Sequence, residues 1–283
     1  MTNSFIRLSR TVALGITLAL ALTLGLSTRV NAAEAAAAGA AGAANAEGAA
    51  GAAEVVSWKD WHAGNEVDNV ASLQRGARNF TNYCLGCHSL KYLRWSRLGE
   101  DLKIPTALLT TNLVPSGATP ADYIKTSLRA EDGVAWFGKE PPDLSLMARA
   151  RGVDYLYRFL KTFYADTTRA TRSNNLALDS VAMPAVLSEL EGVKAAVYKN
   201  VDTMVDGKPV VTKVFDHFTM IAPGTLDAAQ YDAFVRDTVN FLDYAGEPVQ
   251  VERRSMGVWV VLFLLVFSGI AWLMKAEYWK DVH

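Results

Sequence analysis

Two cysteines and a histidine stand close together at Cys84, Cys87 and His88, in the run C-x-x-C-H. Three positions are close to one helical turn, so both thiols can lie on one face and add to the two vinyl groups of a haem. The imidazole that follows can reach the iron from that face. The motif therefore predicts one covalently attached haem c, with His88 as an axial iron ligand.

A C-x-x-C pair also occurs in thioredoxin-like redox centres, zinc sites and disulfides. The redox motif normally lies in a βαβ unit, and zinc sites of this kind need a second pair of ligands. The chain has two cysteines in all, and His62, His217 and His283 stand singly and far apart. A disulfide remains an alternative, although it would leave His88 without a role.

The second axial ligand decides what such a haem can do. Iron held by histidine alone is open to small ligands, whereas histidine with methionine closes it and raises its potential. Four methionines are less suitable because they lie in the leader, in a helical stretch or beside the last apolar segment: Met1, Met147, Met256 and Met274. Met183 is favoured because Pro184 restrains its backbone to extended conformations. Met204 and Met220 remain alternatives.

Two predicted helices would position this chemistry. Asp68 is the expected cap of a helix that leads into Cys84, because apolar residues recur three or four positions apart between them. Asp227 and Gln230 match a capping box at the start of a second amphipathic helix, which Gly246 would end. We expect the two helices to pack across each other.

The segment between these helices carries two further signals. Pro141 and Pro142 precede a helical stretch and could present a backbone carbonyl to the free imidazole nitrogen of His88. A simple helix start would explain the same residues. β-Branched residues on both sides of Asp206-Gly207 predict a small β-hairpin.

The chain divides into five predicted parts. Residues 1–32 resemble a signal peptide, with basic residues, a short apolar run and small residues at the end, although an uncleaved anchor is the alternative. Residues 33–53 are almost entirely Ala and Gly and are predicted to be a flexible tether. Residues 54–251 would form the haem domain, 255–275 a transmembrane helix and 276–283 a tail.

The apolar segment 255–275 is long enough to span a bilayer, although a buried core helix is the alternative. Basic residues flank both of its ends, so the positive-inside rule does not set its orientation. Export would place the haem domain in the periplasm and the tail in the cytoplasm, with a single pass through the bacterial inner membrane. The net charge of −1 predicts no nucleic-acid partner.

Several stretches together resemble the cytochrome c1 family, in order and across residues 58–283. They are Gln74–Ala77, Asn82–His88, Pro141–Ser145 with Ala148–Arg151, and Val181–Pro184. A closing helix and a single anchor complete the pattern. The Ala/Gly tether lies outside it, and with two cysteines the chain cannot form the additional disulfide of some relatives.

The resemblance implies a mainly α, class I cytochrome c-like haem domain with one C-terminal transmembrane helix. It implies His88 and Met183 as iron ligands, and Arg149 and Tyr155 facing a haem propionate. It also implies a respiratory subunit of ubiquinol–cytochrome c reductase beside a cytochrome b subunit. Such a subunit takes electrons from the Rieske iron–sulfur protein and gives them to a soluble or membrane-tethered cytochrome c.

Two other functions fit the same motif. One is a haem sensor or catalytic cytochrome with an open iron site, and the other is a membrane-anchored electron donor to a terminal oxidase. In an electron-transfer subunit we expect no independent catalysis on this chain, because the protein's contribution is to hold and tune the cofactor.

Overall fold

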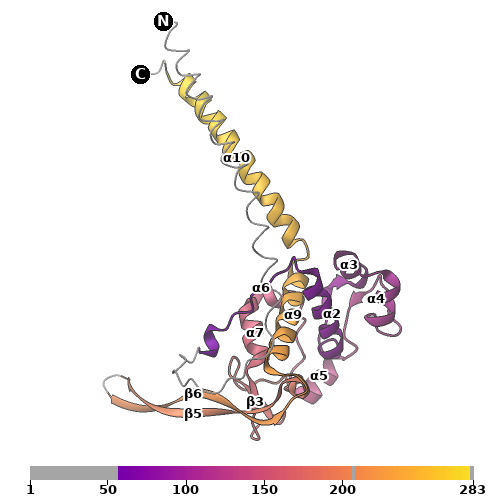
Figure 1. Cartoon of the computed structure of the whole chain (residues 1–283), viewed down its shortest axis with the longest axis vertical. Helices are drawn as coiled ribbons and strands as arrows, with labels where there is room; N and C mark the ends of the chain where they lie inside the picture. Colours follow the sequence, from indigo (N-terminus) through magenta and orange to yellow (C-terminus); the bar gives the residue numbers. More distant parts are fainter. Residues whose placement is uncertain (1–56, 206–207, 281–283) are drawn as a thin grey trace, which may run out of the picture. The chain divides into compact units, whose positions relative to one another are not determined.

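The computed structural model describes residues 57–205 and 208–280. The predicted signal peptide, the tether, the hairpin turn Asp206-Gly207 and the last three residues lie outside this part. The described helices, in chain order, are η1 (Trp58–Asp60), α2 (Val70–Tyr83), α3 (Trp95–Asp101), α4 (Thr106–Asn112), α5 (Ala130–Phe137), α6 (Met147–Arg151), α7 (Val153–Lys161), α8 (Ser188–Glu191), α9 (Ala228–Gly246) and α10 (Gln250–Tyr278) (Figure 1).

Three two-stranded antiparallel sheets accompany the described helices. They pair β1 (Leu90–Arg94) with β2 (Tyr123–Ile124), β3 (Phe163–Ala165) with β4 (Ser173–Asn175), and β5 (Gly192–Val205) with β6 (Lys208–Pro223). The last pair is the predicted hairpin, which pairs from Gly192 opposite Pro223 to Val205 opposite Lys208, with register shifts between Val193 and Lys194 and between Val197 and Tyr198. It extends beyond the run of β-branched residues at its base.

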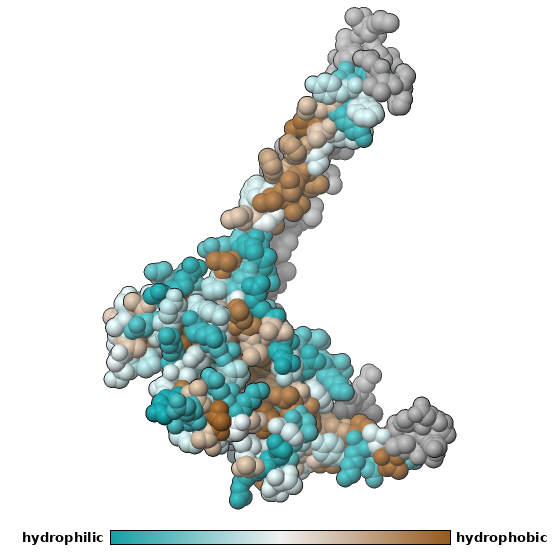
Figure 2. All heavy atoms as spheres, turned by 180° about the vertical axis from the view of Figure 1, so that it is seen from behind, coloured by the Kyte–Doolittle hydropathy of each residue, from teal (hydrophilic) through white to brown (hydrophobic). Residues whose placement is uncertain are grey.

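Helix α10 is 29 residues long, and none of its side chains is buried. At 1.5 Å per residue it is about 44 Å long, more than the roughly 30 Å of a bilayer core. Figure 2 shows its hydrophobic surface bordered by hydrophilic residues at both ends. Its length and composition are therefore those of a candidate membrane span, and its bounds contain the predicted segment 255–275.

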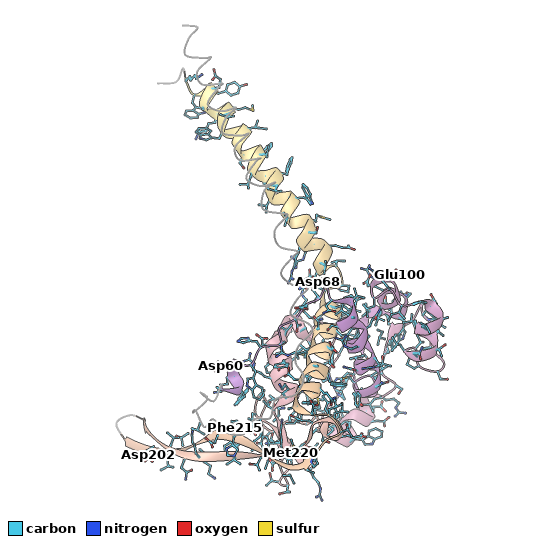
Figure 3. The ribbon with its side chains drawn as sticks, viewed as in Figure 1. Asp60, Asp68, Glu100, Asp202, Phe215 and Met220 are labelled. Atoms are coloured by element: carbon cyan, nitrogen blue, oxygen red, sulfur yellow. The ribbon has the colours of Figure 1, made fainter. Side chains whose placement is uncertain are left out.

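The predicted ends of α9 agree with the structure, but the predicted cap of α2 does not. Helix α9 has the complete capping box between Asp227 and Gln230, and it ends at Gly246. Helix α2, by contrast, is capped by Asn69, whose side chain accepts a hydrogen bond from the Ser72 amide. Asp68 lies one residue before this cap (Figure 3), so its prediction as the cap was wrong.

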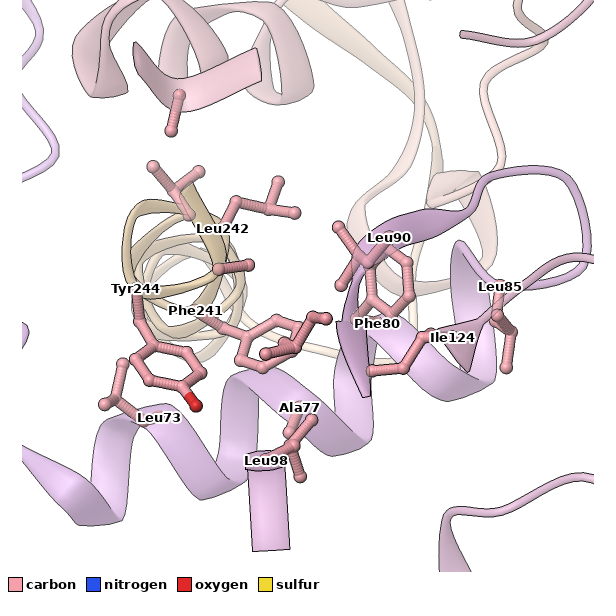
Figure 4. Packing of buried hydrophobic residues seen from close by; sticks show 14 of the residues in the cluster. Leu73, Ala77, Phe80, Leu85, Leu90, Leu98, Ile124, Phe241, Leu242 and Tyr244 are labelled. Carbon is pink, nitrogen blue, oxygen red and sulfur yellow. The ribbon is translucent and has the colours of Figure 1, made fainter. Parts of the chain in front are cut away.

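Helices α2 and α9 cross in close contact, as predicted, and Figure 4 shows the apolar cluster around them. A Cβ atom on Gly76 of α2 would lie 2.1 Å from the Asp237 carbonyl oxygen and 2.5 Å from Phe241 Cβ on α9. Such distances leave no room for any side chain at this position. Phe80 packs next to the crossing, with its ring centroid 5.7 Å from that of Phe241.

Polar side chains link the same two helices. The guanidinium of Arg75 donates two hydrogen bonds to the Asp237 carboxylate, at 2.5 and 2.8 Å. The Ser72 hydroxyl donates a third, at 2.7 Å. Asp237 is buried, so this paired geometry compensates for removing its charge from water. The crossing is thus fixed both by shape and by matched charge.

We predict that Gly76→Ala will lower the free energy of unfolding by about 1–3 kcal/mol, the range typical of overpacked contacts, because α2 and α9 must separate to admit the methyl group. Urea unfolding of the detergent-solubilised protein, followed by circular dichroism, measures this change. Arg78→Ala is the control, because Arg78 lies on the exposed side of the same helix. Equal stability of the two variants would contradict the proposed role of the crossing.

Candidate functional site

The C-x-x-C-H motif lies directly after α2 and forms a turn of its own. The Cys84 amide donates to the Phe80 carbonyl at 2.9 Å, which continues the helix by one residue. The amides of Cys87 and His88 both donate back to the Cys84 carbonyl, at 3.0 and 2.8 Å. Both cysteines are free thiols in this structure. The core helix thus holds two thiols and one imidazole on a single turn.

The imidazole of His88 is oriented by a backbone carbonyl from a distant part of the sequence. Its Nδ1 lies 2.8 Å from the Pro142 carbonyl oxygen, as the proline pair suggested. With Nδ1 as the donor, Nε2 keeps its lone pair for a metal. Burial lowers the pKa of His88 despite this hydrogen bond, so the ring is neutral at physiological pH, as a ligand to iron must be.

The Cys84 thiol lacks the low pKa of an attacking thiol in a redox-active pair. Burial, together with the neighbouring Cys87, raises the pKa of the Cys84 thiol to about 12. Catalytic C-x-x-C centres instead lower the pKa of the attacking thiol so that it ionises near neutral pH. Within residues 57–205 and 208–280, no group of three or more His, Cys, Asp or Glu side chains could hold a metal ion. The geometry therefore favours covalent attachment over thiol exchange.

A cavity of about 490 Å³ lies against Cys84 and His88. This volume is within the 300–1,000 Å³ typical of ligand sites. Its walls come from α6, α7, α9 and the segment that contains Met183, and they are mainly apolar: Leu144, Leu156, Phe159, Leu160, Val181 and Leu242. A second hollow of about 90 Å³ shares Cys84, His88 and Met183 with it. The site is thus a largely dry cleft that begins at the two thiols.

The structure separates the candidate methionines. Met183 lines both hollows, as His88 does. Met220 lies on β6 (Figure 3), is 52% exposed and lines neither. Met204 belongs to β5, opposite Pro209 near the hairpin turn. Met147, which the sequence reasoning set aside, lines the larger cavity only, so Met183 is the methionine that shares most of its surroundings with His88.

The two residues expected near a propionate have different positions. Tyr155 on α7 lines the cavity, but Arg149 on α6 does not. Arg149 is exposed, and its stem lies against Gly246, where an added Cβ would approach Arg149 Cγ to 3.2 Å. Arg151 lines the cavity instead, with its guanidinium carbon 5.6 Å from the centroid of the Tyr155 ring.

Sequence reasoning missed Arg151, although helical geometry could have found it. Residues two apart on a helix point in nearly opposite directions, so Arg149 and Arg151 cannot both face one cavity. Lys139, which also lines the cavity, belongs to a loop whose path no local pattern reveals. Two cations at a mainly apolar cleft, which Asp179 also lines, suit a cofactor that carries carboxylates.

These features together fit a haem c. Two thiols on one turn can form the thioether bonds, and His88 can offer Nε2 to the iron. The cavity is large and apolar enough for a porphyrin, and Arg151 and Lys139 can balance the charge of its propionates. The fold and the site thus define a c-type cytochrome.

Comparison with known proteins identifies the family. The sequence model of the cytochrome c1 family matches residues 110–282. The chain is 44% identical to cytochrome c1 of Allochromatium vinosum over 221 residues, which cover 78% of this chain and 88% of the relative. It is 41% identical over 212 residues to a protein of Nitrosomonas europaea named ammonia monooxygenase gamma subunit, with 75% and 84% covered. A protein of Bradyrhizobium diazoefficiens named cytochrome b/c1 is 26% identical over 242 residues, with 75% and 33% covered.

The chain belongs to the cytochrome c1 family. Proteins of this family carry a covalently attached c-type haem, and membership implies an electron-transfer subunit of the bc1 type. The expected family, the mainly helical fold and the cofactor are therefore confirmed.

We predict that Arg151→Gln will lower the haem midpoint potential by on the order of tens of millivolts, because a nearby positive charge favours the reduced form. Arg149→Gln tests the expectation from the family resemblance and should change the potential much less. Spectroelectrochemical titration of both purified variants measures the difference. A larger shift for Arg149→Gln would assign the propionate contact to Arg149.

Proposed function

We propose that this chain is the membrane-anchored cytochrome c subunit of a ubiquinol–cytochrome c reductase. In this role it accepts electrons from the Rieske iron–sulfur protein and passes them to a soluble or membrane-tethered cytochrome c. The observation that carries the proposal is that His88, oriented by the Pro142 carbonyl, lines the same two hollows as Met183. Histidine with methionine is the ligand pair of haems that transfer electrons rather than bind substrates.

In this proposal Cys84 and Cys87 would hold the haem covalently, and His88 and Met183 would hold its iron. When bound, the haem supplies one-electron exchange. The residues of the chain keep the imidazole neutral and oriented, exclude water with the apolar walls, and place Met183 next to the same cleft. A closed coordination sphere disfavours the open-site sensor, because small ligands would have no free position on the iron.

The proposed partners follow from the family. The relative named cytochrome b/c1 supports a cytochrome b subunit as neighbour. Helix α10 supports a single anchor in membrane lipid. The predicted export signal is the reason for proposing the bacterial inner membrane with the haem domain on the periplasmic side. Purification of the native complex tests these partners. Haem b and a Rieske cluster in stoichiometric amounts would support the proposal, whereas co-purification with a terminal oxidase alone would favour the anchored-donor alternative.

We predict that Met183→Ala will leave the haem attached but lower its potential by roughly 0.1 V or more, since axial ligands set haem potentials over about 0.8 V. The reduced variant should also bind carbon monoxide, because the sixth position becomes open. Redox titration measures the potential. Visible spectra measure carbon monoxide binding and the thioether-to-iron absorption band at the red end of the spectrum.

Met147→Leu is the matched control for this experiment. Met147 lines the same cavity, and leucine nearly conserves its volume, so attachment, potential and carbon monoxide binding should stay close to those of the parent protein. If Met147→Leu opened the iron and Met183→Ala did not, the ligand would be Met147.

A further inference from the structure

Arg149 is an arginine of the family-like motif that does not line the cavity beside Cys84 and His88. Its stem packs against Gly246, the last residue of α9, and α10 begins four residues later at Gln250. Its side chain is exposed, and no described residue forms an ion pair or hydrogen bond with it. The charge of Arg149 is therefore held at the junction between the haem domain and the candidate membrane span.

Two further arginines lie at the same junction, in the first turn of α10. Arg253 donates to both oxygens of Glu247, at 2.5 and 3.2 Å. The hydrogen bond from Arg253, together with the nearby charges of Arg149 and Arg254, lowers the pKa of Glu247. Arg253 is thus bound to Glu247, Arg149 packs against the neighbouring Gly246, and Arg254 follows Arg253 in α10.

The acidic residues of the junction do not neutralise this cluster. Glu247 is occupied by the two-point contact with Arg253, and its side chain is only 15% exposed. The hydrogen bond to Asp101 raises the pKa of Arg97, and the charge of Glu252 adds a smaller contribution. No ion pair joins Glu252 to Arg149 or Arg254 in the described part of the chain. Arg149 and Arg254 are thus left without a carboxylate partner in the described part of the chain.

We infer that Arg149 and Arg254, with Arg253 beside them, form a binding site for the phosphate of an anionic phospholipid at the membrane surface. Guanidinium groups recognise phosphate by paired, charge-assisted hydrogen bonds. The cluster stands where the hydrophobic surface of α10 begins (Figure 2), which is where the phosphates of a bilayer lie. The inference rests on the proposed anchoring through α10.

The test uses the full-length protein with its haem in micelles of a neutral detergent, titrated with phosphatidylglycerol or phosphatidylcholine. Native mass spectrometry counts the bound lipid. We expect the parent protein to bind phosphatidylglycerol more tightly than phosphatidylcholine. The double variant Arg149→Gln with Arg254→Gln should bind phosphatidylglycerol about 25-fold more weakly, because each basic residue near a membrane surface contributes about fivefold in affinity. The haem potential should change much less than in Arg151→Gln.

The charge-matched control replaces two exposed basic residues elsewhere, Arg78→Gln on α2 with Lys125→Gln after β2. It should keep the full preference for phosphatidylglycerol. An equal loss in the control, or an unchanged affinity in the Arg149 and Arg254 variant, would overturn the inference. Inorganic phosphate that competes at the same concentration as the lipid would also overturn it, because the site would then recognise the free anion.

Failure of the anchoring proposal gives a different result. Alkaline washing of membranes that contain the parent protein would release a chain that α10 does not anchor, and this would overturn the proposed function. The micelle titration needs no bilayer and no partner subunit, so it tests the lipid site independently of the proposed function.

Discussion

The close crossing of α2 and α9 at Gly76 is the constraint on which the rest of the structure depends. Because the Cβ atom of any larger residue would lie as close as 2.1 Å to an atom of α9, the two helices can pack in one relative position. The C-terminal end of α2 carries Cys84, while Leu242 of α9 lines the cavity beside it. A contact that contains no functional group therefore decides where the thiols stand relative to the opposite wall of the cleft.

The local parts of this arrangement could be predicted from the sequence. The attachment motif, the capping box of α9 and the crossing of α2 with α9 depend on residues at short spacings, whose geometry the chain itself fixes. The cap of α2 shows the limit of such reasoning. Asp68 and Asn69 are adjacent and both are good cap formers, so only the backbone path decides that Asn69 accepts the Ser72 amide.

The walls of the cleft depend on contacts that no local pattern contains. The Pro142 carbonyl reaches His88 across 54 positions, and the proline pair could only suggest this. Met147 was set aside as part of a helix, yet its side chain lines the cavity. There is another reason why Arg151, and not the expected Arg149, lines the cavity. A family resemblance shows that a motif contains an arginine, whereas the direction of each side chain depends on how the helix is rotated about its axis.

The base of the long hairpin shares a cavity with the segment that contains Met183. A pair of strands is at best marginally stable by itself, so β5 and β6 need attachment at their base. Lys194 at the start of β5 provides it, because its ammonium group contacts Glu191 and donates to the Lys161 carbonyl at the end of α7, at 2.7 Å. Glu191 and Lys194 line a cavity of about 410 Å³ together with Met183. The hairpin base and α7 thus meet at this ion pair, and the pair lines a cavity with the segment of the expected iron ligand.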